Sequence, residues 1–396
     1  MSTPTTVPTM PLVPTDEEQA IRTSVRGICL GFGEDYPRRC HAEERPPTEL
    51  WEALSEAGFT GINIPEQWGG GGLGMSGLTV VAEEIAAAIG MTTLMLVVSP
   101  AIAGTILSIH GTDEQRERWL RGIAAGTTKL AFAITEPDAG TNSHNLRTEV
   151  RRDGGRYLLR GQKTYISGIE DADAVLVITR LRREDGVLGK PTLCIVDVDA
   201  PGFTRDPIAV PYIGPDKQWT LYFDDVEVEP DRIVGGEEGG LPVVFDGLNP
   251  ERIIAAAGCN GLGRRALDKA SAYANEREVW GVPIGAHQAV SHPLARGKVE
   301  LELARLMTTK AAALVDARAN PVSAGEASNM AKFAAADAAC HCVDAAIQAH
   351  GGNGVALEYG VSDLWWMARL ARIAPISEQM ILNHVAQHSL GLPKSY

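Results

Sequence analysis

Long apolar runs are missing from this sequence. No window in its 396 residues approaches the roughly 18 consecutive apolar residues that a bilayer-spanning helix needs. Basic residues are also outnumbered, since 36 Lys and Arg stand against 50 Asp and Glu, for a formal net charge of −14. Because nucleic-acid binding depends on the neutralisation of phosphates by Lys and Arg, this balance argues against a nucleic-acid partner.

Cysteine is sparse as well. Six Cys in 396 residues are far too few for a disulfide scaffold. The first residues, MSTPTTVPTMPLVPTDEE, have neither the basic nor the apolar segment of a secretory signal. These features predict a soluble, reduced, cytoplasmic protein without a membrane span.

A helical pattern surrounds a β-rich stretch in the middle of the chain. The first helix is expected to start at Thr15 as N-cap, with Glu18 completing a capping box. Further helices are expected over 48–57, 75–90, 92–109, 112–124, 251–275, 288–316, 324–350 and 375–390. Between them lie the short β-type runs LAFAI, YLLRGQKTYIS, AVLVITRL, TLCIVDV and LYFDDVEV, which are separated by turns.

This order of patterns predicts a mainly α protein rather than a doubly wound α/β sheet. We expect four parts, namely a disordered tail over 1–14, an N-terminal helical domain over 15–128, a small antiparallel middle β domain over 129–240, and a C-terminal four-helix bundle over 241–396.

Two motifs suggest chemistry that their context does not support. Gly72-Leu-Gly74-Met-Ser-Gly77 matches G-x-G-x-x-G, but a dinucleotide fingerprint needs a strand before it, and here a Pro-Glu turn and glycines precede it. Cys340-His341-Cys342 looks like a metal cluster, but adjacent residues of a helix point about 100° apart and cannot easily share one ion. We therefore expect a loop at the first motif and no metal at the second.

Four other segments occur in a fixed order and are more specific. The first follows a β run and reads Phe132-Ala-Ile-Thr-Glu-Pro-Asp-Ala-Gly-Thr141, a loop that exposes N–H groups and hydroxyls. The others are Lys163-Thr-Tyr165-Ile-Ser167-Gly168, Arg277-Glu-Val-Trp280-Gly281 with Gln288 beyond, and Gln348-Ala-His-Gly351-Gly352. With Ile64-Pro65-Glu66 and the stretch from Gly111 to Leu120, they resemble the acyl-CoA dehydrogenase family over residues 15–390.

The resemblance implies a fold, a cofactor and a reaction. The fold is an N-terminal helical domain, a middle β domain and a C-terminal four-helix bundle. The cofactor is a non-covalent FAD, and the assembly is usually a homotetramer. The reaction is α,β-dehydrogenation of an acyl thioester, carried by CoA or an acyl-carrier protein, with electrons passed to an electron-transfer flavoprotein.

The resemblance also assigns cofactor residues. Phe132, Ile134 and Thr135 correspond to residues that line the flavin ring. Tyr165 stands where the family usually has Trp, and Ser167 where it has Thr. Gly140 and Thr141 correspond to positions near the FAD phosphates or the substrate entry. The residues implied to reach the FAD of a neighbouring subunit are Arg277, Trp280, Gln288, Gln348, Gly351 and Gly352.

The usual catalytic base is missing. Counting without a gap from Gln348 places Pro375 where most of the family has its Glu, and Glu378 falls off that position. In the isovaleryl-CoA and long-chain subgroup, a Glu directly before an Arg on the first long C-terminal helix takes this role, and Glu251-Arg252 matches it. The bland alternative is a helix start, with Asn249 as N-cap, Pro250 in the first position and Glu251 in the first turn.

The substrate residues implied by the resemblance include this altered segment. They are Thr141, Arg252, Ala374, Pro375 and Ile376. The family's backbone N–H at the position of Pro375 donates to the thioester carbonyl, and proline has no N–H, so Ile376 is the replacement donor or the reaction departs from the family's. Two rivals therefore stay open, a flavin-dependent oxidase or monooxygenase on the same fold and a non-catalytic thioester or FAD scaffold.

Overall fold

The computed structural model describes residues 13–211, 214, 216–237 and 239–394. Most of the predicted disordered tail, residues 1–12, lies outside the described residues. The chain divides into two compact units. Unit 1 comprises Met1–Tyr36, Gly74–Thr92 and Arg252–Tyr396, and unit 2 comprises Pro37–Leu73 and Thr93–Glu251.

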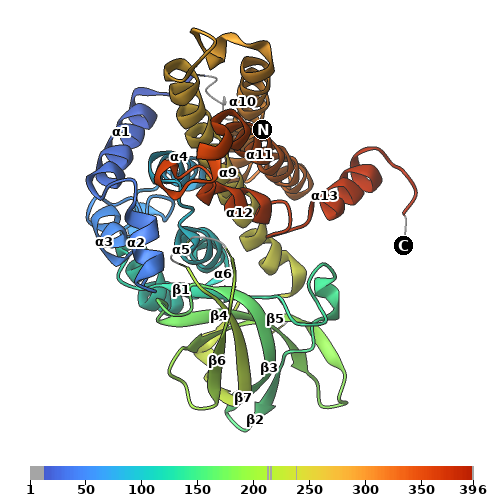
Figure 1. Ribbon diagram of the computed structural model, residues 1–396. Helices are drawn as coiled ribbons and strands as arrows, with labels where there is room; N and C mark the ends of the chain where they lie inside the picture. Colours follow the sequence, from blue (N-terminus) through green and yellow to red (C-terminus); the bar gives the residue numbers. More distant parts are fainter. Residues whose placement is uncertain (1–12, 212–213, 215, 238, 395–396) are drawn as a thin grey trace, which may run out of the picture. The chain divides into compact units, whose positions relative to one another are not determined.

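Unit 2 is built around an eight-stranded sheet with the strand order β6-β7-β3-β2-β4-β5-β8, and β1 pairs with β4 (Figure 1). The central strand β4 is apolar because both of its faces are covered, and its residues from Ala174 to Ile178 are fully buried. The strands are β1 (Leu130–Ala133), β2 (Glu149–Asp153), β3 (Arg156–Ser167), β4 (Ala174–Arg182), β5 (Leu188–Asp197), β6 (Phe203–Ile208), β7 (Gln218–Val228) and β8 (Ile233–Val234).

Every predicted β run lies in a strand, but the sheet is not purely antiparallel. Strands β1 and β2 both pair with β4 in parallel, while the remaining pairs are antiparallel. Alternation of apolar residues identifies a strand but not the direction of its partner, and the strands β2 and β6 are too polar to stand out.

The helices of unit 2 are shorter than predicted. The expected helix over 92–109 is α5 (Leu94–Leu96), the π-helix η2 (Val97–Gly104) and α6 (Thr105–His110). Pro100 lies inside η2 and cannot donate an N–H to the preceding turn, which accounts for the widened turn. The others are α2 (Tyr36–Ala42), α3 (Thr48–Glu56), α7 (Asp113–Gln115), η3 (Arg116–Leu120) and α8 (Arg121–Ala125).

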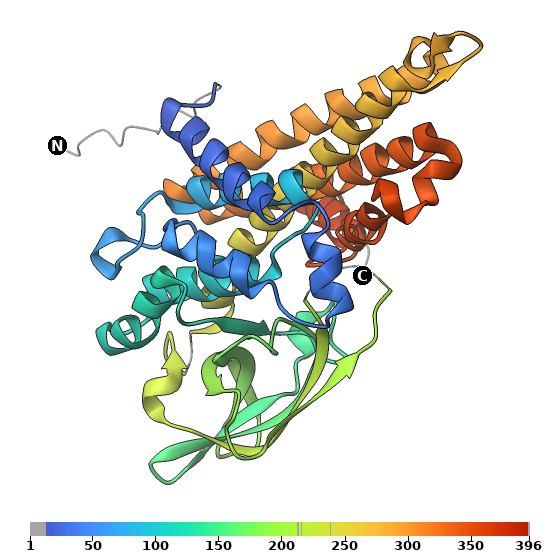
Figure 2. The ribbon, with the colours of Figure 1, turned by 60° about the vertical axis from the view of Figure 1, so that its left-hand side comes forward.

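Unit 1 is helical. The first helix begins at the predicted N-cap, because the Thr15 hydroxyl accepts from the Glu18 N–H at 3.1 Å. The Glu18 carboxylate accepts from Arg22 instead of completing the predicted capping box. Figure 2 shows α9 and α10 running side by side toward a small hairpin of β9 (Glu278–Val279) and β10 (Val282–Pro283). The helices are α1 (Asp16–Gly31), α4 (Gly74–Ile89), the second part of α9 (Gly240–Glu276), α10 (Gln288–Asp316), α11 (Pro321–His350), α12 (Asp363–Leu370) and α13 (Glu378–His384).

Helix α9 corrects one expectation. It begins at Gly240, so Asn249 is not an N-cap and Pro250 lies inside the helix. The Asn-Pro-Glu sequence is typical of a helix start, but capping preferences are local. They do not take account of the apolar pattern that begins upstream of Asn249. The last predicted helix, over 375–390, is the short helix α13 followed by the π-helix η9 (Val385–Ser389). No helix among the described residues is long and apolar enough to cross a bilayer.

A buried ion cluster joins four helices of unit 1. The α4 carboxylates Glu83 and Glu84 are 3% and 2% exposed. Arg264 of α9 contacts them at 2.7 and 2.5 Å, Arg22 of α1 reaches Glu84 at 2.9 Å, and Arg305 of α10 reaches Glu83 at 3.0 Å. Burial acts to raise the pKa of Glu84, but Arg264 and Arg22 outweigh it and hold the pKa below its usual value.

We expect Arg264→Met to lower the free energy of unfolding by about 3 kcal/mol, because it leaves buried carboxylates short of a cation. Urea denaturation followed by circular dichroism measures the change. The control is Arg160→Met, whose exposed guanidinium lies 3.3 Å from Asp224 and is expected to contribute less than about 1 kcal/mol. Equal effects of the two substitutions would contradict the importance of the buried cluster.

Candidate functional site

In unit 2, the predicted flavin-lining residues lie where β1 ends. Phe132 is buried within the strand, and Ile134 and Thr135 follow it half-buried. The chain then turns, and Glu136 and Ala139 exchange backbone hydrogen bonds at 3.2 and 3.1 Å. Gly140 and Thr141 are exposed just beyond this turn.

Strand β3 brings the second predicted segment to the same place. The Thr164 N–H donates to the Thr135 carbonyl at 2.9 Å, so the two segments are in direct contact. Tyr165 lies at an irregularity of the β3–β7 pairing, with a φ of 57° and 64% of its side chain exposed. A left-handed backbone is unusual for a bulky residue. Ser167 is half-buried, and its hydroxyl accepts from the Gln218 amide at 2.8 Å.

Two buried charges beside this segment were not predicted as site residues. Lys163 is fully buried, and its ammonium donates to the Ile134 carbonyl and to Glu136, both at 2.9 Å. Lysine is rarely buried without a partner, so the signal available in the sequence was a Lys at an inward-facing position of an alternating strand.

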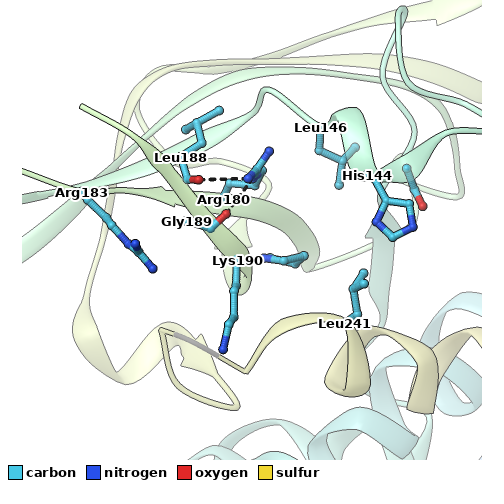
Figure 3. A pocket seen from close by; sticks show the side chains of 10 residues that line it. His144, Leu146, Arg180, Arg183, Leu188, Gly189, Lys190 and Leu241 are labelled. Carbon is cyan, nitrogen blue, oxygen red and sulfur yellow. Dashed lines mark hydrogen bonds between the residues drawn. The ribbon is translucent and has the colours of Figure 1, made fainter. Parts of the chain in front are cut away.

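A basic pocket of about 300 Å³ opens in unit 2 beyond the loop. Figure 3 shows His144 and Leu241 on one side of it and Arg180, Arg183 and Lys190 on the other. Arg180 donates to the carbonyls of Leu188 and Gly189 at 2.9 and 2.8 Å, which ties β4 to β5. Among the described residues that line the pocket, none is acidic. No sequence motif marks this pocket, because its basic residues are scattered along the chain.

The two candidate bases differ in their surroundings. Glu251 lies half-buried within α9, in unit 2. Glu378 begins α13 in unit 1, where the Arg372 Nε donates to it at 2.7 Å. This hydrogen bond holds the pKa of Glu378 below its usual value.

The altered segment before α13 is held by a buried lysine. Ala374 and Pro375 are exposed, and Ile376 is half-buried. Lys332 of α11 is 1% exposed, and its ammonium donates to the Ile376 carbonyl at 2.5 Å. Arg252, the predicted substrate residue beside Glu251, is buried in α9 and belongs to unit 1.

The other predicted cofactor residues of unit 1 lie at the hairpin after α9. Arg277 and Gln288 are exposed, and Trp280 is 88% exposed with a φ of 55°. The Ile284 N–H donates to the Arg277 carbonyl at 2.8 Å and closes the hairpin. The Trp280 ring packs edge-on against His287, with ring centroids 5.8 Å apart.

An aromatic cluster places the remaining predicted residues near this hairpin. Gln348, Gly351 and Gly352 are exposed where α11 ends. The adjacent His350 stacks on Tyr273 at 4.3 Å, and Tyr273 accepts the Arg277 N–H on its carbonyl. The end of α11 therefore lies next to the end of α9 within unit 1.

The remaining motifs carry no chemistry of their own. No group of three or more metal-ligating side chains occurs in the described part of the chain. Cys340 contacts the Ala368 carbonyl, and His341 pairs with Glu300 at 2.7 Å. The six cysteines are free and buried, and burial raises the pKa of Cys194 and of Cys259 to about 12. Gly74 begins α4, and no strand lies between residue 13 and Gly72.

Helices, a mixed β-sheet and long helices follow one another along the chain, which is the element order of an acyl-CoA dehydrogenase-type flavoenzyme. Models of the N-terminal, middle and C-terminal acyl-CoA dehydrogenase domains match residues 15–127, 131–226 and 238–390. The chain belongs to the acyl-CoA dehydrogenase family, which confirms the predicted family, fold class and FAD cofactor and makes the protein an oxidoreductase.

The relatives cover almost the whole chain. Acyl-CoA dehydrogenase FadE12 of Mycobacterium tuberculosis is 50% identical over 97% of this chain and 98% of its own. The structure of a glutaryl-CoA dehydrogenase with glutaryl-CoA is 28% identical, with a TM-score of 0.89 over 98% of both chains. The butyryl-CoA dehydrogenase of Megasphaera elsdenii is 26% identical, with a TM-score of 0.90 over 96% of this chain and 100% of its own.

Proposed function

We propose that the chain holds its FAD through the group of residues in unit 2, and that the group at the hairpin and the end of α11 in unit 1 reaches the FAD of a neighbouring subunit. Tyr165 and Trp280 expose flat aromatic faces at left-handed backbone positions, where a bulky side chain is normally disfavoured. Such surfaces fit the planar ring systems of FAD. Phe132, Ile134, Thr135 and Ser167 complete the isoalloxazine contacts.

The polar parts of the cofactor need different partners. Arg277 carries a guanidinium suited to the pyrophosphate, since planar N–H donors bind phosphate oxygens in pairs. Trp280, Gln288, Gln348, Gly351 and Gly352 complete this second group. Gly140 and Thr141 serve the phosphates or the substrate entry.

The proposed reaction is α,β-dehydrogenation of an acyl thioester to the 2-enoyl thioester. When bound, FAD supplies the acceptor for the β-hydrogen, which leaves as hydride. Glu251 removes the acidic α-proton with its carboxylate, as a general base positioned within hydrogen-bond reach of the substrate. Arg252, next to it, is assigned to the substrate site.

The position of Glu251 is the observation that carries this proposal. Pro375 occupies the usual place of the base and has no acidic group, and Glu378 is engaged by Arg372. Glu251 lies inside the long helix α9 rather than in its first turn, so helix-start chemistry does not account for it. Its half-buried carboxylate is held by a regular backbone, which suits a base that must be positioned accurately.

The thioester carbonyl needs an N–H donor that Pro375 cannot supply. Lys332 holds the Ile376 carbonyl, so the peptide after Pro375 has a defined orientation. Within the described chain, no hydrogen bond uses the Ile376 N–H. We assign the donor role at the developing negative charge to this N–H, with Ala374 and Thr141 completing the substrate contacts.

The basic pocket favours CoA over an acyl-carrier protein. The adenosine end of CoA carries three phosphate groups, whereas a carrier protein presents a single phosphodiester. Four basic side chains and, within the described chain, no acidic one line the pocket. This lining is an electrostatic match to clustered phosphates.

The chain is proposed to act as a cytoplasmic homotetramer that passes electrons to an electron-transfer flavoprotein. On α10, Val299, Leu303 and Leu306 form an apolar stripe, exposed by 60%, 62% and 47%. Residues spaced by three and four lie on one helix face, and a second copy would remove this face from water.

The first test concerns the base. Glu251→Gln keeps the side-chain shape but removes the proton acceptor, so flavin reduction by acyl-CoA is expected to fall by about 10³-fold while FAD and substrate still bind. Anaerobic stopped-flow bleaching near 450 nm measures the rate over a series of acyl chain lengths and branching patterns.

Glu378→Gln is the matched control and should cost far less. An inactive Glu378→Gln beside an active Glu251→Gln would reverse the assignment. Flavin that stays oxidised under every thioester would favour the scaffold, and reoxidation faster by O₂ than by electron-transfer flavoprotein would favour the oxidase.

The second test concerns the carrier. Lys190→Ala should raise KM for acyl-CoA about tenfold, because it removes a charge-assisted contact to phosphate. Steady-state kinetics with acyl-CoA and with the matching acyl-pantetheine, which lacks the phosphates, separate this effect from a general one. The same KM ratio for both substrates would contradict the phosphate role.

The third test concerns assembly. Arg277→Ala should release FAD and weaken the tetramer together, because the guanidinium is expected to bind the cofactor of a neighbouring subunit. Analytical ultracentrifugation with detection at 280 and 450 nm reports both, with Arg160→Ala as control. Retention of both FAD and the tetramer would remove Arg277 from the cofactor site.

A further inference from the structure

Lys163 has no role in the proposed reaction, yet it and Lys332 are the largest fully buried side chains among the described residues. Its two hydrogen bonds, to the Ile134 carbonyl and to Glu136, both end on the segment that directly follows β1. Removing a lysine ammonium from water is costly unless it is paired. The buried ammonium of Lys163 therefore binds this segment through both of these hydrogen bonds.

Glu136 links this segment to a third part of the chain. Its carboxylate is 6% exposed and accepts from the Arg147 N–H at 2.7 Å and from the Thr148 N–H at 2.9 Å. These two donors lie at the entrance to β2, just after Leu146 of the basic pocket. One carboxylate thus joins the end of β1, strand β3 and the segment leading from the pocket.

The protonation states of Lys163 and Glu136 depend on this arrangement. Burial lowers the pKa of Lys163 to about 8, although Glu136 opposes the shift. Burial acts to raise the pKa of Glu136, but Lys163 and the Arg147 N–H outweigh it, and the pKa lies below its usual value. At neutral pH the pair is therefore charged on both sides.

The contacts of Lys163 and Glu136 hold the residues that we assign to the flavin. The Ile134 carbonyl accepts from Lys163, and the Thr135 carbonyl accepts from the Thr164 N–H next to Tyr165. A displacement of this strand end would move Ile134, Thr135 and Tyr165 as one group.

We propose that Lys163 and Glu136 are positioning residues for the cofactor, which set the place of the Ile134–Thr135 strand end and of the Tyr165 ring against the isoalloxazine. This inference rests on the proposed FAD contacts of unit 2 and not on the identity of the substrate. Neither residue touches the reacting atoms.

The test compares the bound flavin in two variants. Lys163→Met keeps the aliphatic stem but orphans the Ile134 carbonyl and the Glu136 charge. Glu136→Gln keeps the volume but offers one oxygen to three donors. In each variant we expect FAD to bind at least about tenfold more weakly, with a shifted flavin absorption band near 450 nm and an altered flavin reduction potential.

Arg264→Met is the matched control, since it breaks a buried ion cluster in unit 1. A merely structural role predicts that Lys163→Met behaves like this control, with lower stability but an unchanged FAD dissociation constant, spectrum and potential in the folded protein. That result would overturn the proposal. If Lys163→Met does not fold, the same three readouts on Glu136→Gln decide, and wild-type values there would overturn it equally.

The readouts need no substrate. Failure of acyl-CoA to reduce the wild-type flavin would sink the proposed reaction and leave this inference standing. Unchanged flavin properties in both variants would overturn this inference and leave the proposed reaction standing.

Discussion

A buried carboxylate must be given cations or N–H donors, and this requirement decides where distant parts of the chain meet. In unit 1, Glu83 and Glu84 gather arginines from three other helices. In unit 2, Glu136 gathers Lys163 and two backbone N–H groups. Apolar packing is tolerant of small shifts, whereas these contacts demand particular partners at particular places. The sheet end that we propose as a cofactor contact is held by such an interaction.

The proposed change of base alters what holds the catalytic group. The usual position lies in the segment before α13, where Pro375 and its neighbours are exposed. Glu251 is instead carried by the interior of a long helix. Under this proposal, the C-terminal segment takes no part in acid–base chemistry, and its Ile376 N–H binds the thioester oxygen.

Much of the architecture could be predicted from the sequence, because periodicity of two or of about 3.6 residues is a local signal. The direction of β1 and β2 and the start of α9 could not, since they depend on partners far away in the chain. Sequence motifs assigned Thr135 and Tyr165 to the flavin, and the structure brings their two segments into direct contact. The motifs missed Lys163 and the basic pocket, because burial and the clustering of scattered charges exist only in three dimensions.

The burial of all six cysteines has a practical consequence. A thiol whose pKa is about 12, as for Cys194 and Cys259, holds roughly one part in 10⁵ as thiolate at neutral pH. Alkylating reagents therefore meet almost no reactive sulfur until a segment opens. Cys194 lies in β5 of unit 2 and Cys259 in α9 of unit 1. The rate at which each cysteine is alkylated, followed by mass spectrometry, therefore reports local unfolding of its own unit.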